Sequence, residues 1–158
     1  MQQIIDITNK LIIHMDARQW CKLPYPNHPK GCPNYGIRLD CPPIIKTLPE
    51  LFNLNKPHWL AIVDFDIKSH RNKLQKIHPN WSHRQLSCCL YWQGGVRKQL
   101  KQLCYNFTSS HPNTTYSTCP EAMGIQIIRT LKEQHIPVST KIKDTVYKVA
   151  LIGYPMHQ

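Results

Sequence analysis

The sequence predicts an α/β protein whose single-layer mixed sheet is flanked by helices and joined to a long proline-rich cysteine loop. Runs of strand-forming residues alternate with segments of helical periodicity, which is the order typical of this class. Eight of the 13 prolines lie between Pro24 and Pro57, where they prevent regular secondary structure. A chain of 158 residues suits a single domain, so we expect 1–158 to form one unit with a metal-binding loop at 21–57 and an α/β core at 59–154.

In the first half of the chain the hydrophobic pattern predicts one central strand. The apolar patch at 11–13 indicates a short strand, with a helix over 3–14 as the competing interpretation. A short helix is expected within 44–53. The segment 59–67 starts as a continuous apolar run and then alternates apolar and acidic residues, which is typical of a central strand that emerges toward solvent.

The middle of the chain is predicted to be helical. One helix is expected over about 70–77 and a longer one over about 82–107. Gly94 and Gly95 weaken the longer helix and are expected to kink or break it.

The last part of the chain opens on a helix start signal. The letters TCPE at 118–121 match a capping box with proline in the first turn, and helical spacing continues to about Gln134. Two further strands are predicted at 136–138 and 146–154.

Cysteine usage and hydropathy bear on the compartment. No stretch reaches the roughly 20 apolar residues of a membrane helix, and the first residues lack the basic and apolar regions of a signal peptide. We therefore expect a cytoplasmic protein with no membrane partner. Seven cysteines cannot all pair as disulfides, and clustered thiols in a reducing compartment suggest metal ligation or catalysis.

Three cysteines follow the pattern Cys21-x10-Cys32-x8-Cys41 inside the proline-rich segment. Thiolates are soft ligands for zinc or iron–sulfur clusters, and a metal can organise a loop that has no core of its own. Three free, buried thiols are the alternative, since cysteine also packs as a small hydrophobe. We favour the metal interpretation because a proline-rich loop offers little core to pack into.

Two segments carry a resemblance to a known family. Residues 32–43 read CPNYGIRLDCPP and residues 121–125 read EAMGI. They resemble the Cys, Tyr-Gly and Cys-Pro-Pro motif and the Glu-Ala-x-Gly-Ile helix start of an uncharacterised family of predicted metal-binding proteins. The resemblance implies a cysteine-ligated centre, with iron–sulfur as one option, and implies no reaction. This chain departs from the family in its wider first spacing, in lacking a second C-x2-C cluster and in having Cys119 where the family tends to have serine.

Cys21, Cys32 and Cys41 leave a fourth ligand to be found, and His28 or Cys119 are the candidates. We favour a [4Fe–4S] cluster, which tolerates irregular cysteine spacing, with zinc as the alternative. Cys119 is expected at a helix N-terminus, where the helix dipole lowers the pKa of a thiol. A cap without chemistry is the competing role for Cys119. Glu121 is a candidate general acid/base beside the cluster, and its competing role is the capping-box carboxylate.

The formal charge of +11 is concentrated in the middle of the chain, because no Asp or Glu occurs from Ile67 to Pro120. Basic and aromatic side chains are interleaved there, which suits a nucleotide or RNA. A solvated basic face is the alternative. The predicted substrate-binding residues are Arg97, Lys98, Lys101 and Trp92.

Together these features predict a small intracellular iron–sulfur protein that binds or acts on a nucleotide or RNA. If it is an enzyme, an open iron of the cluster would support non-redox sulfur chemistry. The alternative is a zinc-stabilised nucleic-acid-binding module without catalysis. The sequence leaves open whether the protein is an enzyme.

Overall fold

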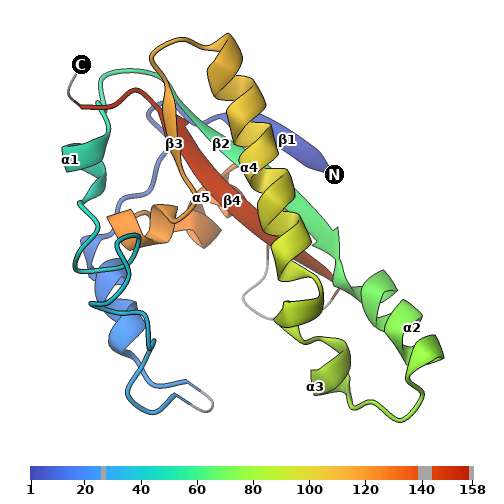
Figure 1. Cartoon of the computed structure of the whole chain (residues 1–158). Helices are drawn as coiled ribbons and strands as arrows, with labels where there is room; N and C mark the ends of the chain where they lie inside the picture. Colours follow the sequence, from blue (N-terminus) through green and yellow to red (C-terminus); the bar gives the residue numbers. More distant parts are fainter. Residues whose placement is uncertain (26–27, 139–143, 157–158) are drawn as a thin grey trace.

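The computed structural model describes residues 1–25, 28–138 and 144–156. Its centre is one four-stranded sheet with the order β1-β2-β4-β3, and helices pack against it (Figure 1). The strands are β1 (Gln2–Asp6), β2 (His58–Asp66), β3 (Thr115–Ser117) and β4 (Thr145–Gly153). The α/β class and the single sheet flanked by helices are confirmed. Every strand pair in the described chain is antiparallel, so the sheet is antiparallel where the sequence predicted a mixed one.

The two central strands match the predicted strands at 59–67 and 146–154. They pair along their full length, with Leu60 opposite Leu151 and Ala61 opposite Ala150. Successive side chains of a strand point to opposite faces, so each face of the sheet carries its own apolar set. Both faces are therefore covered, which explains why these strands read as nearly continuous apolar runs.

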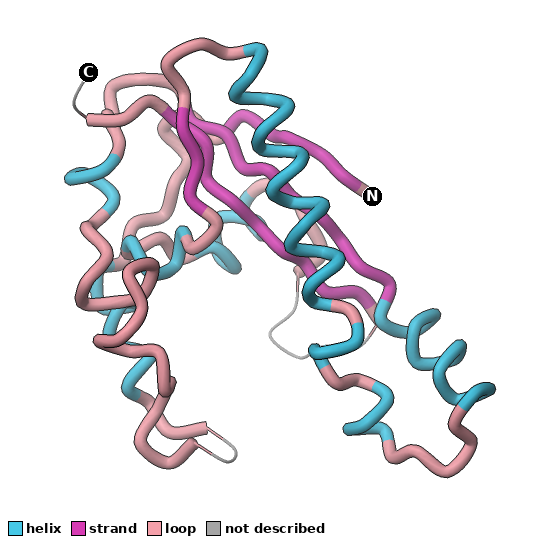
Figure 2. Tube along the Cα trace, in the orientation of Figure 1, coloured by secondary structure: helices cyan, strands magenta, loops and turns pink. Residues whose placement is uncertain are grey.

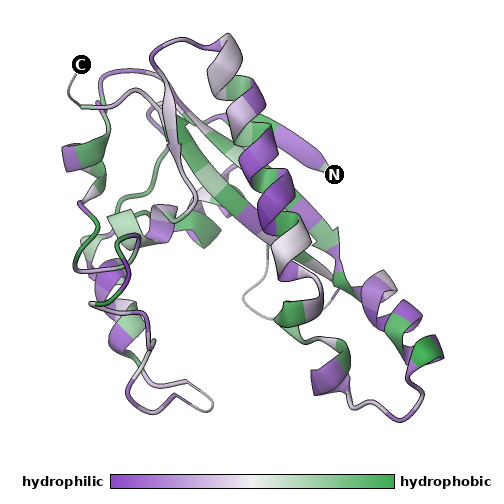
Figure 3. Ribbon diagram, in the orientation of Figure 1, coloured by the Kyte–Doolittle hydropathy of each residue, from purple (hydrophilic) through white to green (hydrophobic). Residues whose placement is uncertain are grey.

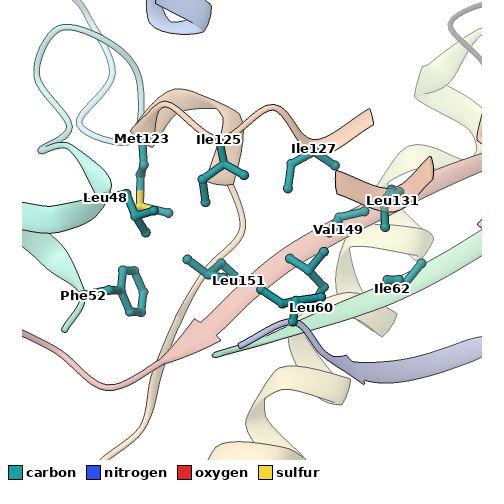
Figure 4. Packing of buried hydrophobic residues seen from close by; sticks show 11 residues of the cluster. Leu48, Phe52, Leu60, Ile62, Met123, Ile125, Ile127, Leu131, Val149 and Leu151 are labelled. Carbon is teal, nitrogen blue, oxygen red and sulfur yellow. The ribbon is translucent and has the colours of Figure 1, made fainter. Parts of the chain in front are cut away.

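One face of the sheet packs under the turns and short helices that surround the cysteine segment (Figure 4). Leu60 and Leu151 are fully buried there, against Met123 and Ile125 from the segment before α5. The short helices on this face are α1 (Leu48–Leu51) and α5 (Ile127–Glu133). The α1 helix lies within the predicted 44–53 segment.

The opposite face is covered by α4 (Gln93–Ser110), the long helix that crosses the sheet in Figure 1. Val96, Leu100 and Cys104 are buried against the strands. The central strand residues beneath them, Ala61 and Ala150, are small, so the helix can approach the sheet closely. The other side of α4 is largely hydrophilic and faces solvent (Figure 3).

The predicted helix at 70–77 is confirmed and begins earlier, as α2 (Ile67–Ile77). Asp66 ends β2 and caps α2, because its carboxylate accepts from the Ser69 amide at 2.8 Å. The helix predicted over 82–107, with a kink or break at Gly94 and Gly95, is interrupted, but at an earlier position. A capping box starts the short α3 (His83–Leu86), a turn with η2 (Cys89–Tyr91) follows, and α4 starts only at Gln93. The break therefore precedes Gly94 and Gly95.

The N-terminal predictions are also wrong. The chain begins with β1, and the 11–13 patch forms only an isolated bridge between Ile13 and Ile125. No helix covers 3–14 in the structure. The next element after β1 is the 3-10 helix η1 (Met15–Lys22) (Figure 2). Ile5 in β1 and Ile7 and Leu11 in the irregular backbone after it all pack at the core. Their spacing therefore fits neither a strand nor a helix over the whole segment.

The predicted helix from 118 to 134 is divided in two. The 3-10 helix η3 (Pro120–Met123) ends at Gly124, whose φ of 97° is left-handed, and α5 follows. A Cβ at Gly124 would lie 2.6 Å from the Met15 sulfur, so glycine lets η1 approach. The predicted strand at 136–138 is absent, and Ile136 and Val138 pack instead at the edge of the core.

Candidate metal centre

The cysteine-bearing part of the predicted 21–57 loop, called the cysteine loop below and described over residues 21–25 and 28–44, projects away from the sheet (Figure 2). After the end of η1 at Lys22, its described residues form turns, bends and an isolated bridge between Tyr25 and His28, and none of them belongs to either hydrophobic cluster. One anchor is Arg18 on η1, whose guanidinium donates to the carbonyls of Pro43 and Ile45 at 3.2 and 2.6 Å. The loop therefore has a fixed end but no apolar core of its own.

The first two cysteines are brought together by the backbone. The amide of Cys32 donates to the carbonyl of Cys21 at 2.7 Å. Gly31 makes this approach possible, because its φ is 83° and a Cβ there would lie only 2.5 Å from the Cys21 carbonyl oxygen. A glycine is thus required between the two predicted ligands.

The third cysteine lies beside Cys119. The Cys41 thiol donates to Oδ1 of Asp40 and the Cys119 thiol donates to Oδ2 of the same carboxylate, each at 3.8 Å. The same carboxylate forms an ion pair with Arg38 at 3.1 Å. The chain segment before η3 is therefore folded against the end of the cysteine loop.

Electrostatic effects connect the four cysteines. Burial raises the pKa of the Cys21 thiol, and Cys32 raises it further. Burial, Asp40, Cys119 and Cys32 all raise the pKa of Cys41. These thiols are close enough to oppose one another's ionisation. A metal would bind them only with release of protons, and its positive charge would then offset that repulsion.

The predicted low pKa of Cys119 is wrong. Burial raises the pKa of this thiol, and the Asp40 carboxylate raises it further. The helix that follows, η3, is a short 3-10 turn, and Cys119 makes no side-chain capping bond to it. Its amide instead donates to the Ser117 hydroxyl at 3.3 Å. The expected capping box is therefore absent at 118–121.

The donor set fits a thiolate-bound centre by its chemistry. The structure pairs Cys21 with Cys32 through a backbone hydrogen bond and brings Cys41 and Cys119 to the Asp40 carboxylate, and thiolates suit both zinc and iron–sulfur clusters. Within the described ranges, no three Cys, His, Asp or Glu side chains already lie at spacings that would hold a metal ion. His28, the other predicted fourth ligand, packs its ring against Tyr25 in a tilted arrangement, at a centroid distance of 4.5 Å.

The remaining cysteines lie elsewhere. Cys104 lies on the sheet-facing side of α4, where burial raises the pKa of its thiol to about 12. Cys88 and Cys89 lie in the turn before α4 rather than inside the helix.

A cavity of about 340 Å³ joins the cysteine loop to α4 and β4. Two predicted substrate-binding residues, Arg97 and Lys101, therefore share it with two predicted metal ligands. Its lining includes Arg38, Asp40, Cys41, Arg97, Lys101, Cys119 and Lys148.

Lys148 is a cavity residue that the sequence analysis missed. It is partly buried, and its pKa is lowered first by burial and then by Arg97, while Glu121 opposes the shift. The alternation of side chains along β4 puts Lys148 on the same, α4-facing side as Ala150 and Ile152, and this could have been inferred from the sequence. A lysine on a covered face of a central strand is unusual and indicates a polar site.

The other predicted substrate residues are placed differently. Lys98 is exposed and lines a neighbouring cavity with Arg97 and Lys101. Trp92 is partly buried, stacks on Phe65 at 5.1 Å and donates to the Ser87 carbonyl at 3.4 Å. One face of the Trp92 ring is thus already occupied by the core.

Glu121 is exposed to solvent, yet the surrounding protein raises the pKa of its carboxyl. Desolvation is the main cause, and the nearby Lys148 opposes it. Its charge in turn raises the pKa of Cys21 and Cys119. Glu121 lines a cavity of about 260 Å³ together with Thr118 and Lys148.

Comparison of the chain with protein-family models, curated proteins and solved structures finds no match. The resemblance to a metal-binding family thus rests on the two motifs alone. No helix in the described part of the chain is long and apolar enough to cross a membrane.

Proposed function

We propose that this chain is a cysteine-ligated metalloprotein, holding a [4Fe–4S] cluster, that binds a nucleotide or RNA beside the cluster in the cytoplasm. The observation that carries the proposal is the shared cavity, because Cys41 and Cys119 line it from one side and Arg97 and Lys101 from α4. A soft-metal donor set and an anion-binding set in one cavity support a metal centre with an anionic substrate.

Cys21, Cys32 and Cys41 would hold the cluster, and Cys119 is the candidate for the fourth position. With all four thiolates ligating, the cluster would be structural or would transfer electrons, whereas an open iron would act as a Lewis acid or sulfur acceptor. The loop has no apolar core, so we expect metal binding to order it.

The basic side chains of the cavity would bind phosphate. Arg97 and Lys101 lie one helical turn apart on α4, and Lys148 reaches the same cavity from β4. Partial burial of Lys148 strengthens its attraction for an anion, since nearby water screens less. Desolvation raises the pKa of the Glu121 carboxyl, which is the direction that favours a proton-donor role.

The proposal is tested by adding RNA to anaerobically reconstituted protein. If the centre and the substrate share one cavity, RNA changes the charge-transfer absorption of the centre. Arg97→Glu removes this response and most of the RNA affinity, because it reverses a charge in the cavity. Arg129→Glu is the matched control, since Arg129 is an exposed arginine on α5 outside this cavity.

Salt dependence is the second readout. RNA affinity falls steeply with salt, because phosphate contacts release counterions, and Arg97→Glu lowers the slope. Unchanged RNA affinity and spectrum in Arg97→Glu would contradict the shared site.

A further inference from the structure

A second cavity, of about 430 Å³, adjoins the first along α4. Arg97 and Lys101 line both cavities, so a ligand bound in one is within reach of the other. The second cavity is lined by Arg97, Lys98, Lys101, Gln102, Tyr105 and Tyr116.

The helical repeat places these residues on one side of α4. Arg97, Lys101 and Tyr105 follow at intervals of four residues, so they form a row from the cysteine cavity toward the second one. Adjacent members of the row are about 6 Å apart along the helix axis. Tyr116, on the edge strand β3, is partly buried against the core beneath α4 and borders the same cavity.

Tyr105 is the unusual member of the row. Its side chain is 63% exposed although it lies on the helix that covers the core. A large aromatic ring among basic residues provides a surface on which a nucleobase can stack.

The charge of this face points to a polyanion. None of the ion pairs in the described chain involves Arg97, Lys98 or Lys101. Acidic residues are absent from the sequence between Ile67 and Pro120, and Asp40, the carboxylate that shares the first cavity with Arg97 and Lys101, is paired with Arg38. The phosphate groups of a nucleic acid supply the negative charge that would balance Arg97, Lys98 and Lys101.

We propose that the second cavity is a base-stacking subsite for single-stranded nucleic acid. One base stacks on Tyr105, the adjoining phosphates bind Arg97 and Lys101, and the next nucleotide enters the cavity of Cys41 and Cys119. This inference rests on the proposed function and narrows its substrate to a single strand of at least two nucleotides. A duplex is excluded as the substrate of this subsite because its base faces are already stacked.

The test uses fluorescence anisotropy with three probes. They are a labelled single-stranded RNA of about ten nucleotides, the same sequence as a duplex, and heparin as a polyanion without bases. Tyr105→Ala weakens single-strand binding about 5- to 160-fold, the range for loss of one stacked base. Tyr105→Phe retains the affinity because it keeps the ring, and binding of the duplex and of heparin is unchanged in both variants.

Tyr91→Ala is the matched control. Tyr91 is similarly exposed, at 56%, and lines neither cavity. An equal loss in Tyr91→Ala and Tyr105→Ala, or an equal loss for RNA and heparin, overturns the subsite. RNA binding by the wild type with full affinity in Tyr105→Ala overturns the subsite and leaves the proposed function standing. No RNA binding by the wild type refutes the subsite together with the RNA-binding part of the proposed function.

Discussion

Cys41 and Cys119 place their Sγ atoms at the same distance, 3.8 Å, from the two oxygens of one carboxylate, that of Asp40. In the chain they are separated by the entire β2–α4 segment. The contact means that the sheet topology, rather than local sequence, brings a fourth cysteine to the loop. It also places a carboxylate between two proposed ligands, and anionic thiolates repel a carboxylate. Both oxygens of Asp40 already accept from the Arg38 guanidinium, so we expect this ion pair to persist and the two thiols to turn away from the carboxylate when metal binds.

The loop cysteines are expected to be essential for metal binding. Cys21→Ala, Cys32→Ala and Cys41→Ala each lose metal and loosen the loop, because the loop has no apolar core to replace it. Metal analysis and limited proteolysis measure the two effects. Cys89→Ala is the control and keeps its metal, since Cys89 is an exposed thiol outside the cysteine loop. Full metal occupancy in a loop variant would remove that cysteine from the ligand set.

Cys119→Ser distinguishes three roles of this residue. Loss of metal indicates a four-cysteine centre that is structural or transfers electrons. Retention of metal with loss of substrate binding or activity indicates a free thiol beside an open centre. Because the structure shows no capping bond from Cys119, we expect one of these two effects. A variant indistinguishable from the wild type in metal content and RNA binding would contradict both.

Two glycines in the loop form a matched pair. Gly31 and Gly36 both have positive φ, 83° and 72°, but only Gly31 lacks room for a Cβ. Gly31→Ala therefore separates Cys21 from Cys32 and lowers metal affinity, whereas Gly36→Ala bears only the backbone strain of about 1 kcal/mol. Metal titration followed by absorbance compares them. Equal affinities in the two variants would show that the Cys21–Cys32 approach is dispensable.

Burial of Cys104 predicts a pH-dependent reactivity. Desolvation raises the pKa of its thiol to about 12, so it stays protonated when exposed thiols ionise. Burial of the protonated Cys104 thiol contributes fully to the stability of the native protein at pH values below the pKa of this thiol in the unfolded chain. This contribution is lost as the pH rises toward 12. At about pH 9, where a free cysteine is largely thiolate, iodoacetamide labels Cys89 and spares Cys104 in the native protein. Mass spectrometry reads the labels, and equal labelling would contradict the tight packing of α4 on the sheet.

The sequence predicts correctly those strands and helices whose hydrophobic pattern extends over many residues. β2 and β4 are nine-residue strands with strongly apolar patterns, and α2 has its cap in Asp66. β1 and β3 were missed because they are short edge strands, and β3 has only three residues. A short strand contributes too few alternating positions to stand out from a loop.

The helix boundaries failed for a different reason. Helical spacing continues across 82–107 and across 118–134, yet tertiary contacts interrupt both segments. Trp92 stacks on Phe65 just before α4, and Gly124 turns the chain so that Met15 can pack against it. Such contacts come from distant residues and leave no local signal.

At the candidate site, the cysteine pattern identified the loop, and the charge pattern identified the basic side of α4. The sequence alone did not show that these two features line one cavity. Asp40 and Lys148 were missed because their importance depends on the pairing of β4 with β2 and on the approach of the loop to α4. Tyr105 was seen only as one of several interleaved aromatics.

The metal content of anaerobically purified protein tests the central claim most directly. Iron and acid-labile sulfide are measured per chain, together with the absorbance near about 400 nm that thiolate-bound iron produces. The account predicts brown protein with about four irons and four sulfides per chain, as a [4Fe–4S] cluster requires. Colourless protein that carries stoichiometric zinc would contradict the iron–sulfur assignment, and a folded chain that takes up neither metal on reconstitution would contradict the metal centre itself.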